Sequence, residues 1–254
     1  MQSAVLQYLE GLSVDSRARV SKHFDQEVRE FAYLSAKLVA TLQRFHAHHP
    51  SQDADNARQV AFQLMTRGAN TLMAGFELVL TGYMGESEVL LRGALERFAV
   101  AWDLVHNPDR FAAWKVDKKF DSTDSISRLK KEVEPVGNLY GYLSNLHVHI
   151  TPKNSSSSMF LVEGDPKFQF FGYLSPGKEH LPKGQIYFSL FLAYVLLQLT
   201  EVVFHAYCDG FETIEQIPSE DLVRNVISER HRKFVDIGLE HFKLMAEDPL
   251  ATLV

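Results

Sequence analysis

The stretch from Glu86 to His106 combines a helical stripe of large apolar side chains with charged residues beside it. The apolar residues recur at steps of four, three, four and three, which places them on one face of a helix. They are Leu91, Leu95, Phe98, Trp102 and Val105. Arg92, Glu96 and Asp103 lie beside this stripe rather than opposite it. A charged group there must reach water or find a buried partner, so this helix constrains what packs around it.

The composition is that of an ordinary soluble protein, with 46% hydrophobic and 23% charged residues. A formal net charge of -6 argues against a general nucleic-acid binder, which usually carries a basic excess. The single cysteine, Cys208, excludes an intrachain disulfide and a multi-cysteine metal site. The first residues have neither a cationic start nor a long apolar run, so we expect no signal peptide and a cytoplasmic protein.

The most apolar run extends from Ile186 to Cys208. Its unbroken apolar part, 191–197, is too short to span a membrane, which takes about 20 predominantly apolar residues. Gln198, Glu201 and His205 then follow at helical spacing. We therefore expect a helix at the centre of a bundle and no membrane contact.

Apolar periodicity and helix-end signals predict a mainly α, up-and-down helical bundle. The expected helices cover about 2–12, 15–48, 55–82, 86–106, 109–116, 125–148, 185–208 and 219–247. We expect one domain, 1–254, with a core of about 15–148 and 185–247 and an insertion at 150–184. Near 158–173 this insertion resembles two short strands around a turn, which predicts a β-hairpin or a flap. The flap is either a lid or a decorated connection.

Small residues and a proline indicate how these helices pack and where one of them breaks. Gly68 and Gly75 are unfavourable inside a helix, but with Ala61 they allow close approach of a neighbouring helix. The helices on either side of residues 82–85 are therefore expected to form an antiparallel hairpin. Pro135 should kink or break the helix predicted at 125–148.

The stretch YGYLSNLHVHIT carries the main candidate site. In a helix, Tyr140, Ser144 and His147 lie on one face at spacings of four and three. That face could meet Arg92 and Glu96, and such polar groups are costly to bury unless they are hydrogen-bonded to one another. Two interpretations stay open: a small ligand-binding pocket, or a buried network that fixes the register of the helices.

These residues also carry a resemblance. The Arg-x-x-x-Glu spacing at Arg92, the Asn-Pro-Asp helix start at Asn107 and the Tyr-x-x-x-Ser-x-x-His spacing at Tyr140 resemble a group of uncharacterised bacterial helical families. The resemblance covers about residues 60 to 150. These families carry a domain-of-unknown-function label, so the resemblance implies a fold and no reaction.

In outline the chain is also similar to the HEPN helical domains, many of which are metal-independent endoribonucleases or toxin partners. That resemblance implies catalysis on RNA by His147 and Arg92. The HEPN motif places an arginine shortly before its histidine, and no arginine stands at those positions before His147 or His149. Arg92 would have to supply the charge from another helix.

A metal site is a further hypothesis. His147, His149, Glu201 and His205 offer imidazole and carboxylate ligands that suit zinc or iron. Paired Glu-x-x-His motifs, a His-Glu-x-x-His motif and a phosphate-binding glycine loop are absent from the sequence. A catalytic Ser144–His147 arrangement would lack the nucleophile-elbow sequence.

Two functional hypotheses follow. The first is a cofactor-free binding or regulatory protein with a polar pocket around Arg92, Glu96 and His147, which binds a small molecule or a protein. The second is a HEPN-like endoribonuclease or toxin-related protein that acts on RNA with His147 and Arg92. The sequence leaves open whether the protein is an enzyme. The wide apolar face of the expected helix at 219–247 could close the core or form a homodimer.

Overall fold

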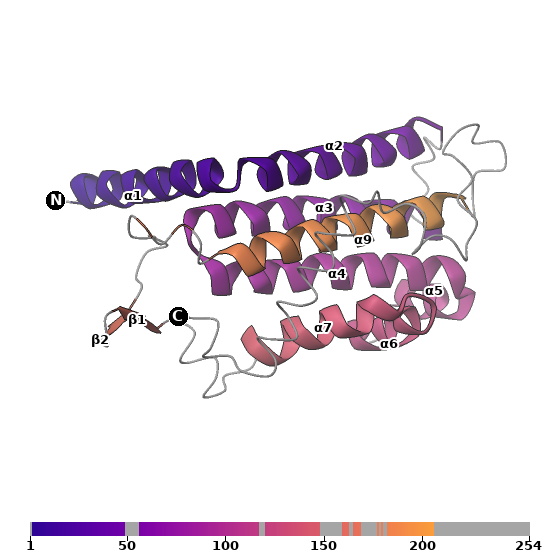
Figure 1. Ribbon diagram of the computed structural model, residues 1–254. Helices are drawn as coiled ribbons and strands as arrows, with labels where there is room; N and C mark the ends of the chain where they lie inside the picture. Colours follow the sequence, from indigo (N-terminus) through magenta and orange to yellow (C-terminus); the bar gives the residue numbers. More distant parts are fainter. Residues whose placement is uncertain are drawn as a thin grey trace.

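The computed structural model describes residues 2–48, 56–116, 120–147, 159–162, 165–168, 177, 179 and 182–205. Its elements are α1 (Gln2–His23), α2 (Asp25–His48), α3 (Ala57–Thr81), α4 (Met84–His106), α5 (Pro108–Lys115), α6 (Ser122–Glu132), α7 (Glu134–His147), β1 (Met159–Val162), β2 (Asp165–Phe168) and α9 (Lys183–His205). The long helices run alongside one another (Figure 1), so the predicted mainly α bundle is confirmed. The two strands pair antiparallel, with Met159 opposite Phe168.

The hairpin of α3 and α4 is the most extensive helix pair of the bundle. Gly82 ends α3 with φ 91°, a left-handed conformation that suits glycine, and the Tyr83 N–H donates to the Leu78 carbonyl over 2.8 Å. A Cβ added at Gly68 would lie 2.6 Å from Phe98 Cε2. At Gly75 it would lie 3.0 Å from a Leu91 methyl carbon. Both glycines therefore allow close helix packing, and the predicted antiparallel hairpin is confirmed.

Helix α4 lies at the centre of the bundle and contacts α3, α5, α6, α7 and α9. Every residue from Phe98 to Leu104 is buried, so this part of the helix is covered on all sides. A second buried helix, α9, is long and apolar enough to cross a membrane by length and composition alone. However, 89% of its most apolar window is buried inside the protein, as in the core helix of a bundle.

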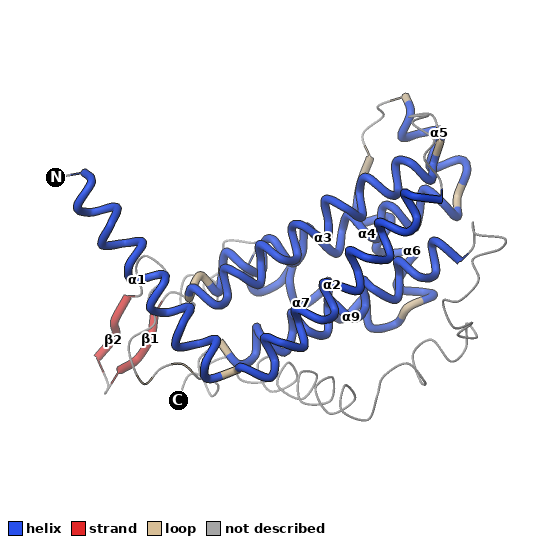
Figure 2. The backbone as a smooth tube through the Cα atoms, turned by 90° about the horizontal axis from the view of Figure 1, so that it is seen from above, coloured by secondary structure: helices blue, strands red, loops and turns tan. Residues whose placement is uncertain are grey.

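The first two helices differ from the prediction. A break between 12 and 15 was expected, but α1 continues to His23 and α2 begins at Asp25. At Phe24 the helical hydrogen-bond pattern continues, because its N–H donates to the Val20 carbonyl over 2.9 Å and its carbonyl accepts from Val28. Figure 2 shows the chain bending at this junction. Continuous apolar periodicity through this bend explains why the sequence pattern did not reveal it.

The other boundaries agree closely with the sequence. The predicted break near Pro135 is confirmed: α6 ends at Glu132 and α7 begins at Glu134. The N-cap of α6 is Asp121, whose carboxylate accepts from the Thr123 N–H over 2.9 Å. The helix predicted at 219–247, Cys208 and most of the insertion at 150–184 lie outside the described residues.

The close packing of α3 on α4 predicts opposite effects of two glycine substitutions. Gly68→Ala should lower the free energy of unfolding by about 1–2 kcal/mol, because its methyl group would overlap the buried Phe98 ring. Gly141→Ala should raise it by about 0.5–1 kcal/mol, because no atom lies within 4 Å and alanine favours a helix. Urea unfolding followed by circular dichroism measures both, and an equal gain in the two variants would contradict the packing argument.

Candidate functional site

Arg92, Glu96 and Tyr140 form a closed hydrogen-bonded triangle between α4 and α7. The Arg92 Nε donates to Glu96 Oε1 over 2.8 Å, and its Nη2 donates to the Tyr140 hydroxyl oxygen over 2.9 Å. The Tyr140 hydroxyl then donates to the same Glu96 oxygen over 3.2 Å. The guanidinium carbon lies 5.0 Å from the centre of the Tyr140 ring, within the range of a cation–π contact. With Ser144, these residues are called the Arg92 cluster below.

The environment keeps Arg92 charged and Tyr140 neutral. Burial lowers the pKa of Arg92, but its contacts with Glu96 and Tyr140 outweigh this effect and leave that pKa raised. The pKa of Tyr140 is also raised, chiefly by burial and then by the Glu96 charge, while Arg92 and the neighbouring Ser144 hydroxyl lower it in part. The phenol therefore stays protonated at neutral pH and can donate a hydrogen bond to Glu96.

Two buried atoms of the Arg92 cluster lack a hydrogen-bond partner within the described part of the chain. They are Arg92 Nη1 and Ser144 Oγ. Nη1 shares its carbon with the Nη2 that binds Tyr140, and the Ser144 hydroxyl neighbours the same phenol without meeting hydrogen-bond geometry. The Arg92 and Glu96 side chains are 18% and 23% exposed, so water reaches the edge of the cluster.

A buried carboxylate lies one helical turn before Arg92. Glu88 is 1% exposed, and its Oε1 accepts from the Gln185 Nε2 of α9 over 3.4 Å. Burial first, and then the Glu88 charge, raise the pKa of Tyr142 well above its usual value. Along α4, Glu88, Arg92 and Glu96 follow one another at steps of four, so two carboxylates flank the arginine.

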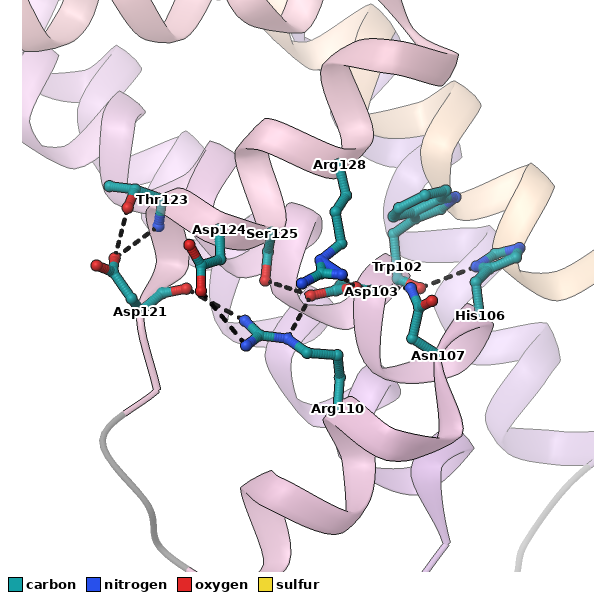
Figure 3. Close-up of polar contacts among 10 residues, drawn as sticks. All are labelled: Trp102, Asp103, His106, Asn107, Arg110, Asp121, Thr123, Asp124, Ser125 and Arg128. Atoms are coloured by element: carbon teal, nitrogen blue, oxygen red, sulfur yellow. Dashed lines mark hydrogen bonds and ion pairs between the residues drawn. The ribbon is translucent and has the colours of Figure 1, made fainter.

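A second cluster surrounds Asp103, near the end of α4 (Figure 3). The Asp103 side chain is completely buried. Its Oδ1 accepts from Asn107 Nδ2 over 2.7 Å, and its Oδ2 accepts from Ser125 Oγ over 2.8 Å and from Arg110 Nε over 3.0 Å. Arg128 Nε lies 3.7 Å from Oδ1. Both carboxylate oxygens are satisfied, so the cluster joins α4 to α5 and α6 and leaves no group for a ligand.

Contacts beyond the carboxylate hold Arg110 in this Asp103 cluster. Its guanidinium carbon lies 4.1 Å from the centre of the Phe120 ring, and its Nη1 lies 3.5 Å from Asp124. Its Nη2 donates to the Asp121 carbonyl over 3.4 Å. The segment that leads into α6 is thus fixed to α5 by one arginine.

The structure describes some of the predicted site residues and leaves others outside its described part. It brings Arg92, Glu96 and Tyr140 together, with Ser144 beside them. His147 ends α7, one turn beyond Ser144, but its side chain lies outside the described part.

The predicted metal ligands stay a prediction. His149 and the side chains of His147 and His205 lie outside the described part, and Glu201 is partly buried, with a pKa raised by burial and lowered in part by Lys37. Within the described residues, no three His, Cys, Asp or Glu side chains gather as metal ligands would.

The sequence missed several partners of α4. The charge of Asp103 beside the apolar stripe indicated a need for partners, but nothing identified Ser125 or Arg110 as those partners. Glu88 was also missed, although its spacing of four from Arg92 could have indicated a common face.

No family model, curated protein or solved structure matches this chain significantly. The resemblances to uncharacterised bacterial families and to HEPN domains therefore stay predictions.

The Asp103 cluster predicts unequal costs for two of its members. Asp103→Ala should lower the free energy of unfolding by about 3–5 kcal/mol, because it leaves three buried or part-buried donors, Asn107, Arg110 and Ser125, without their acceptor. Arg128→Ala is the control and should cost about 1 kcal/mol or less, since Arg128 is 44% exposed. Chemical denaturation measures both variants, and similar costs would show that the carboxylate does not hold α5 and α6.

Proposed function

We propose that this protein is a helical binding module and that the Arg92 cluster is its ligand site. One observation carries the proposal: Arg92 Nη1 and Ser144 Oγ are buried beside one phenol, without a partner in the described structure. Ligand sites in helical bundles are commonly built from side chains that face one another across helices. The Arg92 and Glu96 side chains are partly exposed, so the cluster lies at the edge of the bundle.

Unmet polar atoms support a ligand because they are costly to bury. Each costs about 1–3 kcal/mol, and most buried polar groups in native proteins are paired. Departures from that rule concentrate at functional sites. Asp103, two helical turns beyond Glu96 on α4, has both carboxylate oxygens satisfied by Asn107, Arg110 and Ser125. A ligand that binds Arg92 Nη1 and Ser144 Oγ would remove the cost that the free protein carries.

The alternative is a HEPN-like endoribonuclease that uses His147 and Arg92 on RNA. Proteins bind the phosphates of a nucleic acid mainly through positively charged side chains. Glu96 neutralises Arg92 through a 2.8 Å ion pair, and buried Glu88 lies one turn away. This charge balance supports the binding module over the nuclease.

The test uses one substitution with two opposite consequences. Ser144→Ala should raise the free energy of unfolding by about 0.5–1 kcal/mol, because it removes a buried hydroxyl without a partner and favours the helix. It should also weaken the binding of any ligand that raises the melting temperature of the wild type. Differential scanning fluorimetry with a collection of small polar metabolites measures both effects.

Ser127→Ala is the matched control, because Ser127 is exposed on α6. It should leave ligand binding unchanged and raise the free energy of unfolding only through helix propensity, by about 0.5 kcal/mol or less. A loss of stability in Ser144→Ala would instead assign Ser144 to a network that fixes helix register. If no metabolite raises the melting temperature of the wild type, the binding proposal is wrong.

A further inference from the structure

We infer that the Arg92 cluster recognises a neutral carboxamide group rather than an anion. This inference rests on the proposed binding function and specifies the chemistry of the ligand. It follows from which hydrogen-bonding positions remain open and from the charges around them.

Of the two unsatisfied positions, Arg92 Nη1 needs an acceptor, and the Ser144 hydroxyl can take a donor or an acceptor. Arg92 uses Nε on Glu96 and Nη2 on Tyr140, so the two N–H groups of Nη1 remain. The Tyr140 hydroxyl already donates its hydrogen bond to Glu96, so it offers no further donor. The Ser144 hydroxyl can donate and accept. A carboxamide matches this set, because its oxygen accepts from Nη1 and its NH2 donates to Ser144 Oγ.

A carboxylate or a phosphate suits the charges around these positions poorly. Such an anion has only acceptors, so both Nη1 and the Ser144 hydroxyl would have to donate to it. The positive charge of Arg92 is already offset by Glu96 at 2.8 Å, and Glu88 lies one turn away with 1% exposure. An incoming anion would lose its hydration without a net positive charge in return, whereas a neutral amide loses much less.

The shape of the cluster also favours a planar group. The Arg92 guanidinium lies over the Tyr140 ring, with its central carbon 5.0 Å from the ring centre. A planar carboxamide that extends from Nη1 can stay in the plane of the guanidinium. Arginine presents its N–H donors in that plane, as a rigid fork.

The test compares nicotinamide with nicotinate, which differ only in an amide against a carboxylate. Acetamide and acetate form a second pair without the ring. The full chain is labelled with 15N-arginine, and the Arg92 Nε–H signal is assigned from its loss in Arg92→Lys. Nicotinamide should shift this signal saturably, and nicotinate should bind at least about tenfold more weakly. Ser144→Ala should weaken the binding of nicotinamide.

Each other outcome overturns the inference in a recognisable way. Tighter binding of nicotinate and acetate would assign an anion site and leave the proposed binding function intact. If neither amide shifts the Arg92 signal, the carboxamide assignment is wrong. If another metabolite still raises the melting temperature of the wild type, and less so in Ser144→Ala, the proposed binding function remains supported without the carboxamide assignment. An amide response that persists fully in Ser144→Ala would show that Ser144 takes no part in recognition.

Discussion

The structure depends on one constraint: α4 is buried on almost every side, yet it carries charged side chains. From Phe98 to Leu104 every residue is buried, and one of them is Asp103. A buried charge without hydrogen-bonding partners would cost more than the whole domain can spare. The neighbours of α4 are therefore constrained twice, by apolar packing against its stripe and by the donors that its carboxylates require. Gly68 and Gly75 on α3 meet the first requirement, and donors on α5, α6 and α7 meet the second.

The two charged clusters of α4 resolve this constraint differently because of their chemistry. A carboxylate has two oxygens, and donors from α5, α6 and the residue between α4 and α5 suffice to satisfy those of Asp103. A guanidinium has five N–H groups in a fixed fork, and Glu96 and Tyr140 bind only two of its three nitrogens. The Asp103 cluster is therefore complete, whereas the Arg92 cluster keeps donors that its helices cannot satisfy.

The sequence predicted what depends on local pattern and missed what depends on register between helices. Apolar periodicity identified the helices, small residues in α3 predicted its close partner, and Pro135 marked the break before α7. The face shared by Tyr140 and Ser144 predicted their meeting with Arg92, because both faces were polar within apolar helices. Asp103 shows the limit: its charge required partners, but periodicity cannot align Ser125 of α6 with α4. The bend at Phe24 was missed because the apolar face continues through it.

The Asp103 cluster also positions the Arg92 cluster. Asp103 lies seven residues beyond Glu96, which is about 10 Å along the helix axis. Its hydrogen bond to Ser125 fixes α6 against α4, and a single residue, Val133, connects α6 to α7. The Val133 N–H donates to the Leu129 carbonyl over 2.8 Å, and the Val133 carbonyl accepts from Val136 over 3.0 Å, so the junction is held from both sides. Because α7 cannot shift without α6, the Asp103 cluster sets where the Tyr140 phenol meets Arg92. The Asp103 cluster and the Arg92 cluster are thus two connected parts of one arrangement along α4.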